Sequence, residues 1–309
     1  MQKNNILVSI VMNCYNSDEY LKESIESILN QTYKNFEIIF WDNKSTDNSA
    51  KIINSYNDKR IKYYMTPKFT LLGEARNLAV EKCSGEWIGF LDCDDIYDKN
   101  KILYSLDGLD ESKLENVSLI YTKTKVIDSR GYQVSKMDKV FSGDIHNLLL
   151  TKGNFIALSS IMFQKHIFYK VNQIDVSLNY CEDLDLLLKI SKVSNILGID
   201  KYLTSYRTHI DNITSSKYKE NTIELNNYLS LYILNHKMTL LDTIKVKWGL
   251  LFGINIVTLK LVQESKYNEI FSFINKYKLY SLFLPITITE YIIKKLMVRY
   301  NNRNKHDKN

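Results

Sequence analysis

The sequence predicts an α/β fold with a parallel sheet, followed by a helical C-terminal extension. Patterns of buried strands alternate with helical patterns over residues 6–91. Polar or acidic residues follow three of these strands, and from residue 216 onward the pattern is helical and the charge is basic. Strands that alternate with helices are typical of parallel sheets covered by helices on both faces. Such sheets bind their ligands at the carboxyl ends of the strands.

The composition fits a globular protein in a reducing compartment. The 309 residues are 45% hydrophobic and 25% charged, which is enough for one large domain or a domain with an extension. The four cysteines have neither paired nor metal-ligand spacing, which favours the cytoplasm. Residues 1–5 are polar and the apolar run after them is short, so we expect no signal peptide.

The charge is unevenly distributed along the chain. Residues 216–309 hold 15 Lys or Arg against 7 Asp or Glu, whereas residues 1–215 hold 26 against 28. The net charge of +6 therefore comes from the C-terminal part. No nucleic-acid-binding motif accompanies it, so we expect no nucleic-acid partner. A basic segment with apolar stripes favours contact with an anionic membrane surface.

The first part of the chain predicts four strands and three helices. Ser17 is a good N-cap for the first helix, and Ser45 or Thr46 for the second. Apolar residues recur at helical spacing after Ser17 and again over residues 73–83, where the third helix is expected. The strands are expected at residues 6–12, 36–41, 61–65 and 87–91.

After residue 98 the pattern is less regular. Helices follow from residue 216, but none of their apolar runs, including residues 248–262 and the segment after Pro285, reaches the roughly 20 apolar residues that span a bilayer. The extension therefore either lies on a membrane surface or packs as a helical bundle on the preceding domain. Before it, we expect a helix over residues 99–109, strands over 117–124 and 155–163, and a helix over 183–193.

Residues 86–97, EWIGFLDCDDIY, join a short apolar strand to the carboxylates of Asp92, Asp94 and Asp95. Burying three neighbouring acids without a cation is costly. In proteins, Mg²⁺ is usually held by one or two carboxylates together with substrate phosphates. The stretch is therefore either a metal site or a solvated polar turn after a strand.

Several motifs, in this order, resemble the inverting glycosyltransferases of family 2, which have the GT-A fold, an α/β fold with a mixed sheet. The resemblance implies a GT-A domain over residues 1–215, with a nucleotide-binding half over 1–97 and an acceptor half over 98–215. The extension then covers residues 216–309. The motifs are VSIVMNCYN (8–16), ILNQTYKNFEIIFWDNKSTDNS (28–49), GEARNLAV (73–80), FLDCDD (90–95), CEDLDLLLKI (181–190) and YRTHIDNIT (206–214).

The resemblance implies a binding site for a nucleotide-sugar donor. Asp42 would accept a hydrogen bond from the base, with Tyr15 and Asn16 beside the base or ribose. Arg76 would stack on the base or pair with a phosphate. On the residues alone, Asp42 is equally a helix cap and Arg76 a surface ion-pair partner.

The three acids resemble the DxD motif of the family. The resemblance implies that Asp94 binds Mg²⁺ or Mn²⁺, that Asp92 lies near the ribose or metal, and that Asp95 supports them. His209 matches a family position near the diphosphate or metal and would be a further metal ligand, with Arg207 supporting the same loop. A lone histidine is otherwise more often structural.

Glu182 and Asp183 resemble the ED motif of the family, in which Asp183 matches the catalytic base. Acids at the start of a helix are also stabilised by the helix dipole, so the pattern alone does not require catalysis. Leu187 and Lys189 stand where many relatives have Trp and Arg.

The expected function is transfer of a sugar from a UDP-linked donor to a glycan or lipid-linked acceptor in bacterial surface polysaccharide synthesis. The expected location is peripheral, at the inner face of the cytoplasmic membrane. A nucleotidyltransferase is one alternative, although residues 13–18 lack the glycine of its phosphate loop. A non-catalytic glycan- or membrane-binding protein is the other, and Asp42, Asp94 and Asp183 argue against it.

Overall fold

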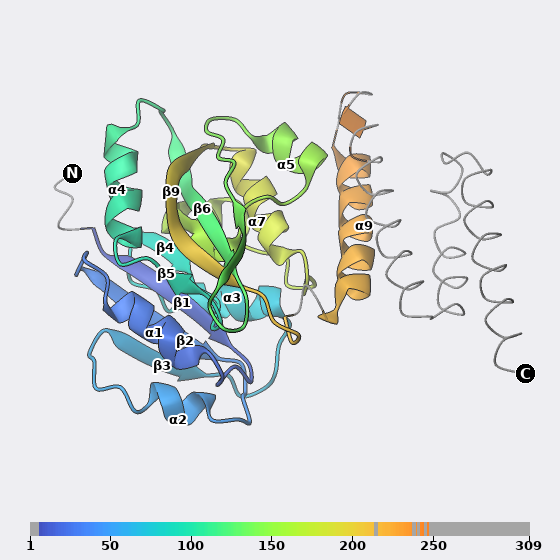
Figure 1. The fold of residues 1–309 in the computed structure, drawn as a ribbon. Helices are drawn as coiled ribbons and strands as arrows, with labels where there is room; N and C mark the ends of the chain where they lie inside the picture. Colours follow the sequence, from blue (N-terminus) through green and yellow to red (C-terminus); the bar gives the residue numbers. More distant parts are fainter. Residues whose placement is uncertain (1–5, 213–215, 237–238, 240–241, 244–245, 247–309) are drawn as a thin grey trace, which may run out of the picture. The chain divides into compact units, whose positions relative to one another are not determined.

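The computed structural model describes residues 6–212, 216–236, 239, 242–243 and 246 (Figure 1). The chain divides into two compact units, Met1–Val246 and Lys247–Asn309. All described residues belong to the first unit. The predicted apolar run 248–262 and the predicted helix after Pro285 lie outside the described residues.

The first half of this unit has the predicted alternation of strands and helices. Its four strands are parallel and lie in the order β3-β2-β1-β4. Every residue of β2 is buried, as expected for a strand covered on both faces. The elements are β1 (Val8–Cys14), α1 (Leu21–Leu29), β2 (Phe36–Asp42), α2 (Ser49–Ile53), β3 (Ile61–Met65), α3 (Leu72–Glu81) and β4 (Trp87–Phe90).

The second half extends the same sheet with strands of both directions. The strand β8 (Ile161–Gln164) is antiparallel to β4 and to β6 (Val117–Ile127). The long strand β9 (Asn195–Arg207) is parallel to β6 and antiparallel to the short strand β5 (Ile96–Tyr97). A further strand, β7 (Gln133–Met137), pairs with β6. The described sheet is therefore mixed, as the fold class predicted.

Helices of this half are α4 (Lys101–Glu111), α5 (His146–Lys152), α6 (Lys165–Lys170), α7 (Glu182–Ser191) and α9 (Tyr218–Asn235). The predictions of α4 and α7 are confirmed to within two residues. The part of the chain that the structure describes contains no helix long and apolar enough to cross a membrane.

Two details of the predicted elements are wrong. The predicted strand over residues 155–163 begins only at Ile161, because Leu158–Ser160 forms a turn of 3₁₀ helix. The N-caps of α1 and α2 are Tyr20 and Asn48, not Ser17 and Ser45 or Thr46. Those three residues instead hydrogen-bond within and between the loops that follow β1 and β2.

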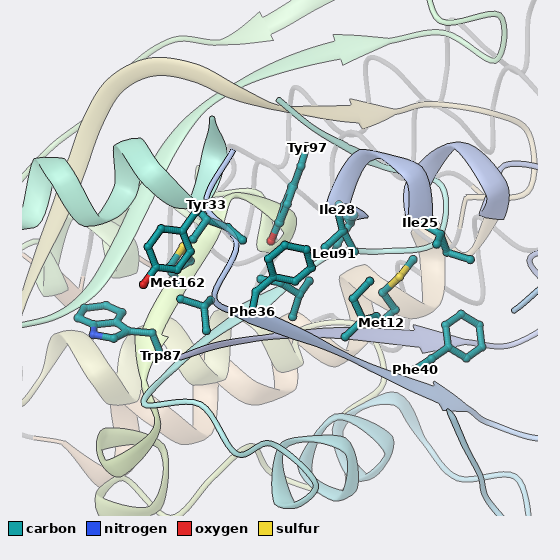
Figure 2. Close-up of a cluster of buried hydrophobic side chains, with 14 of the residues drawn as sticks. Met12, Ile25, Ile28, Tyr33, Phe36, Phe40, Trp87, Leu91, Tyr97 and Met162 are labelled. Carbon is teal, nitrogen blue, oxygen red and sulfur yellow. The ribbon is translucent and has the colours of Figure 1, made fainter. Parts of the chain in front are cut away.

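The core beneath α1 fixes the first strands in place. Figure 2 shows Ile25 and Ile28 of α1 pointing toward the sheet, close to Met12 and Leu91. All four side chains are at most 1% exposed. Burial of each such side chain contributes roughly 1.5–3 kcal/mol. This packing holds β1 and β4 beneath the same helix, so the loops that follow them lie at one edge of the sheet.

Candidate active site

Three predicted loops meet at one edge of the sheet. Residues Cys14 and Asp42 lie side by side at the ends of β1 and β2, and Phe90 pairs with Val11 of β1 at the end of β4. Because these strands are parallel, their carboxyl ends deliver the loops after residues 14, 42 and 90 to the same place. The predicted donor residues therefore come together.

Asp42 ends β2 and is fully buried. Its Oδ1 accepts a hydrogen bond from the Ser45 backbone N–H at 2.7 Å, and its Oδ2 accepts one from the Tyr63 hydroxyl at 2.9 Å. Burial and the nearby Asp42 carboxylate raise the pKa of Tyr63 to about 12, so the phenol stays a donor. Each carboxylate oxygen has a second lone pair, but the side chain is 0% exposed, so contact of Asp42 with a base stays a prediction.

Tyr15 and Asn16 form the loop after β1. The Tyr15 ring is 50% exposed and meets the Phe69 ring edge-on, with centroids 4.8 Å apart. Asn16 has a φ of +50°, a conformation that asparagine tolerates better than most residues. Its Oδ1 accepts the Thr46 backbone N–H at 2.7 Å, which ties this loop to the loop after β2. Phe69 was not predicted, since nothing in its local sequence distinguishes it.

Arg76 of α3 is buried and lies between two carboxylates. It donates to Glu182 Oε1 and, at 3.3 Å, to Asp92 Oδ1. The ion pair with Glu182 is almost fully buried on both sides, whereas the Asp92 side chain is 38% exposed. Arg76 thus links the end of β4 to the start of α7. Contact of Arg76 with a base or phosphate stays a prediction.

The acids after β4 differ in their surroundings. Asp95 is buried, and its two oxygens accept from the Ser159 hydroxyl at 2.5 Å and the Arg207 backbone N–H at 2.9 Å. Burial, followed by the charges of Asp94 and Asp92, raises the pKa of Asp95 well above its usual range. Asp95 therefore faces the protein, where it holds the loop that follows β9.

Asp94 faces His209 and Asn212 from that loop. Its Oδ2 lies 2.9 Å from His209 Nε2 and accepts from Asn212 Nδ2 at 3.1 Å. The Arg207 guanidinium supports this arrangement, since its Nε donates to the backbone carbonyl of Asp94 at 2.9 Å. Burial and then the charge of Asp92 raise the pKa of the Asp94 carboxyl. A cation at Asp94 would remove that cost.

Asp94 and His209 could together hold a divalent metal. The 2.9 Å between Asp94 Oδ2 and His209 Nε2 fits two neighbouring corners of an octahedron with bonds of about 2.1 Å, whose edge is about 3.0 Å. Within the described residues, no group of three or more His, Cys, Asp or Glu side chains could hold a metal. Two protein ligands still fit Mg²⁺, because phosphates and water complete its shell.

Glu182 and Asp183 are the first residues of α7. Asp183 is partly buried, and its carboxylate accepts from Asn154 Nδ2 and from the Leu184 backbone N–H, both at 2.6 Å. Burial, followed by the neighbouring charge of Glu182, raises the pKa of Asp183 to about 7. A carboxylate with this pKa can accept a proton near neutral pH. Asn154 was not predicted, because residues 125–180 carry no motif.

Several buried polar atoms at this edge have no partner. Among the described residues these include Arg76 Nε, Glu182 Oε2, His209 Nδ1 and both side-chain polar atoms of Asn13. Buried polar groups are usually hydrogen-bonded, so unpaired ones call for an explanation. Arg76 contacts Asp92 and His209 contacts Asp94, so at least two of these unpaired atoms belong to residues beside the predicted donor and metal sites.

Comparison with known proteins identifies the family. The profile described as Glycosyl transferase family 2 matches residues 9–171. The chain belongs to glycosyltransferase family 2. This confirms the resemblance on which the site predictions rest.

Two curated relatives and one solved structure illustrate the range of matches. An uncharacterized glycosyltransferase of Rickettsia bellii is 32% identical over 72% of this chain, and the match spans only 32% of that protein. The Escherichia coli protein WfgD, a UDP-Glc:alpha-D-GlcNAc-diphosphoundecaprenol beta-1,3-glucosyltransferase, is 31% identical over 69% of this chain and 82% of its own length. The S. aureus TarS fragment 1–349, in complex with UDP-GlcNAc, matches with a TM-score of 0.61 at 20% identity, over 78% of this chain and 70% of its own. The last likeness confirms the GT-A fold.

Proposed function

We propose that this protein is an inverting glycosyltransferase that moves a sugar from a UDP-linked donor to a glycan or lipid-linked acceptor. One observation carries the proposal: Arg76 joins Asp92, beside the predicted donor site, to Glu182, which precedes Asp183. A donor-side carboxylate and a carboxylate of near-neutral pKa are thereby held in one site. Inverting transfer requires that the donor, the acceptor hydroxyl and the base lie close together.

In this mechanism Asp183 takes the proton of the acceptor hydroxyl as that hydroxyl attacks the anomeric carbon. The bond to the nucleoside diphosphate breaks on the opposite face of the sugar. Asp42 and Tyr15 would hold the base of the nucleotide. Asn154 orients Asp183 through its 2.6 Å hydrogen bond.

Asp94 and His209 would hold Mg²⁺ or Mn²⁺, with Asp92 beside them. When bound, the metal would neutralise charge on the leaving diphosphate. The protein contributes the buried Arg207, which supports Asp94 by donating to the Asp94 backbone carbonyl. It also contributes Asn212, whose side-chain amide donates to Asp94 Oδ2, the oxygen that faces His209.

The relatives support the choice of donor and pathway class. WfgD is described as using UDP-Glc on a lipid-diphosphate-linked sugar, and the TarS fragment was solved with UDP-GlcNAc. We therefore place the protein in surface polysaccharide synthesis. The basic segment after residue 216 favours a peripheral position on the anionic inner face of the cytoplasmic membrane. Family membership disfavours the nucleotidyltransferase alternative.

The decisive variant is Asp183→Asn. We expect sugar transfer to fall by at least about 100-fold, because a general base contributes 10²–10⁴-fold. Donor binding, measured by calorimetry, should stay within twofold, because Asp183 acts on the acceptor. A non-catalytic binding protein would instead keep its whole function in this variant, and that outcome would refute the proposal.

The donor is identified by binding and hydrolysis of a panel of UDP-, GDP- and CMP-sugars with and without Mn²⁺. Selection of one UDP-sugar that depends on Mn²⁺ supports Asp42 as the base contact and Asp94 as the metal ligand. Metal-independent binding would contradict the assignment of Asp94 and His209 as metal ligands. Binding of no member of the panel would contradict the assignment of the donor site.

A further inference from the structure

A single carboxylate on α9 holds the segment that precedes the acid pair. Glu224 Oε1 accepts the backbone N–H groups of Tyr180 at 2.7 Å and Cys181 at 2.9 Å. The Asn179 backbone N–H lies 3.1 Å from both oxygens of the same carboxylate. Three consecutive N–H groups therefore point at one side chain from an element more than 40 residues further along the chain.

This segment leads directly into the acids. Cys181 is the N-cap of α7, and within the described residues its side chain makes no capping hydrogen bond. Glu224 accepts the backbone N–H of this N-cap residue from another helix, as a Glu at N3 of the same helix does in a capping box. The next two residues are Glu182 and Asp183, so their backbone positions depend on the anchored segment.

The same segment is attached to α3. The Asn179 side chain accepts the Leu72 backbone N–H at 3.0 Å, and the Leu178 carbonyl accepts the Gly73 backbone N–H at 3.2 Å. Arg76, which pairs with Glu182, lies one turn further along α3. The segment thus positions both members of the buried ion pair beside Asp183.

Two tyrosines continue the contact of α9 with its neighbours. The Tyr228 hydroxyl donates to Asp185 Oδ1 of α7 at 2.9 Å. The Tyr232 hydroxyl lies 2.9 Å from His146 Nε2 of α5. Residues 224, 228 and 232 share one face of the helix. Figure 1 shows α9 running alongside α5 and α7, as these contacts require.

We propose that Glu224 is a positioning residue for sugar transfer, which holds residues 179–181 so that Asp183 meets the acceptor hydroxyl. This deepens the proposed function and rests on the role of Asp183 given there. The helix α9, which follows the last motif, would then be part of the catalytic domain. In this proposal Glu224 acts through residues 179–181 and the start of α7.

The physical basis is the cost of unpaired N–H groups. Without the carboxylate, three N–H groups lose their acceptor, and the segment relaxes toward water. A displacement of about 1 Å at a catalytic group can lower a rate by about 100-fold. Among the described residues, Glu224 hydrogen-bonds the segment 179–181 and not the loops after β1, β2 and β4, so the donor site is linked to Glu224 only indirectly, through Arg76.

The test compares four variants of the full chain. Glu224→Ala removes the acceptor, and Glu224→Gln keeps a carbonyl oxygen but not the charge. Tyr228→Phe removes a hydrogen bond between α9 and α7 without changing residues 179–181, so it controls for loosened packing. Glu220→Gln changes an exposed acid on the same helix and controls for charge. Steady-state transfer and donor binding are measured for each.

For Glu224→Ala we expect kcat to fall by at least about 10-fold, with donor Kd within twofold. Glu224→Gln should keep an intermediate kcat, and added formate should restore part of the lost kcat of Glu224→Ala by occupying the vacated position. The two controls should stay within about threefold of the unmodified chain. Equal losses in Glu224→Ala and Tyr228→Phe would overturn the inference, because packing alone would explain them.

Amide hydrogen exchange gives a readout that does not depend on activity. In Glu224→Ala the amides of residues 179–181 and 183 should exchange faster, while those of β1 and β4 keep their protection. Unchanged exchange at residues 179–183 would overturn the inference whatever the activity. If the unmodified chain transfers no sugar, the proposed function fails, and exchange still decides whether Glu224 holds this segment.

Discussion

At the residue scale, the candidate site contains acids whose ionised forms are destabilised by burial and by neighbouring carboxylates. Burial and Glu182 both disfavour the ionised form of Asp183, and only the Arg76 charge and local N–H donors favour it. The result is a pKa of about 7 for Asp183. A base with this pKa is partly ionised at neutral pH and still binds a proton strongly.

The pH dependence of transfer should report this balance. Because the base works only when ionised, kcat should rise with pH below about 7 and level off above it. In Asn154→Ala the carboxylate loses a hydrogen-bond donor, which raises the pKa of Asp183 and moves the rise to higher pH. The pH profile of kcat measures both effects.

The control for this profile is Asn147→Ala, an exposed asparagine on the adjacent helix α5. It should reproduce the unmodified profile. A profile that is flat between pH 5 and 8, taken as roughly the range around the raised pKa, would mean that Asp183 does not control the rate.

The ion pair of Arg76 and Glu182 gives a second prediction at this scale. Arg76→Met leaves a buried carboxylate unpaired, which should destabilise the protein by about 3 kcal/mol. Adding Glu182→Gln removes that charge and should restore part of the loss. Urea unfolding of the single and double variants measures the coupling. Additive losses would mean that the pair contributes no interaction energy.

At the scale of elements, the docking of α3 against the segment before α7 depends on one glycine. A Cβ on Gly73 would lie 2.6 Å from the Asp175 carbonyl oxygen and 3.0 Å from the Leu178 carbonyl oxygen. These are backbone atoms, so they cannot move aside as a flexible side chain would. The close approach is what brings Arg76 within reach of Glu182.

Gly73→Ala should therefore separate α3 from this segment. We expect a loss of stability of about 1–3 kcal/mol, as for an overpacked core, and a larger fall in kcat than in donor affinity. Thermal unfolding and steady-state kinetics measure the two effects. Glu81→Ala, at an exposed position of the same helix, should leave both unchanged. If Gly73→Ala were as stable as the unmodified chain, the segment with Asp175 and Leu178 could move away from α3 without a loss of stability.

The elements also show what the sequence could and could not predict. The runs 8–14 and 36–42 are mostly apolar, because both faces of these strands are buried, so they were readily predicted. The strand β9 was not predicted, since its buried and exposed residues do not alternate and its register with β6 shifts. The strand β5 has two residues and exists through its pairing with β9.

The same distinction applies to the candidate site. Asp42, Asp94 and Asp183 were predicted as site residues because they stand in motifs next to predictable elements. Glu224 was not, since a glutamate on a helix looks the same whether it faces water or three N–H groups of a distant segment. The partners of Arg76 were also missed, because a buried ion pair across 106 positions leaves no local pattern.

At the scale of the whole molecule, the net positive charge and the candidate active site lie in different parts of the chain. Residues 247–309 hold 11 Lys or Arg against 4 Asp or Glu, whereas residues 1–246 hold 30 against 31. Residues 1–246 also form the compact unit that contains Glu224. The proposed membrane contact and the proposed active site should therefore be separable.

A chain that ends at Val246 tests this separation. We expect it to lose sedimentation with anionic vesicles, since nearly all of the basic excess is removed. It should keep donor binding and transfer to a soluble acceptor. A chain that ends at Lys219 should also lose transfer, because it lacks Glu224. Unchanged vesicle binding by the chain that ends at Val246 would exclude residues 247–309 as the anchor.

The contact of Arg207 with Asp95 has a consequence for biosynthesis. These residues are 112 positions apart, and Arg207 also supports Asp94 and reaches Glu23 of α1. Contacts this distant in sequence form late, because a long loop must close first. While the ribosome is still adding residues before 207, the three acids of the nascent chain lack this arginine. We therefore expect residues 1–97 to be made early but to lack the support of Arg207 until about two thirds of the protein has been translated.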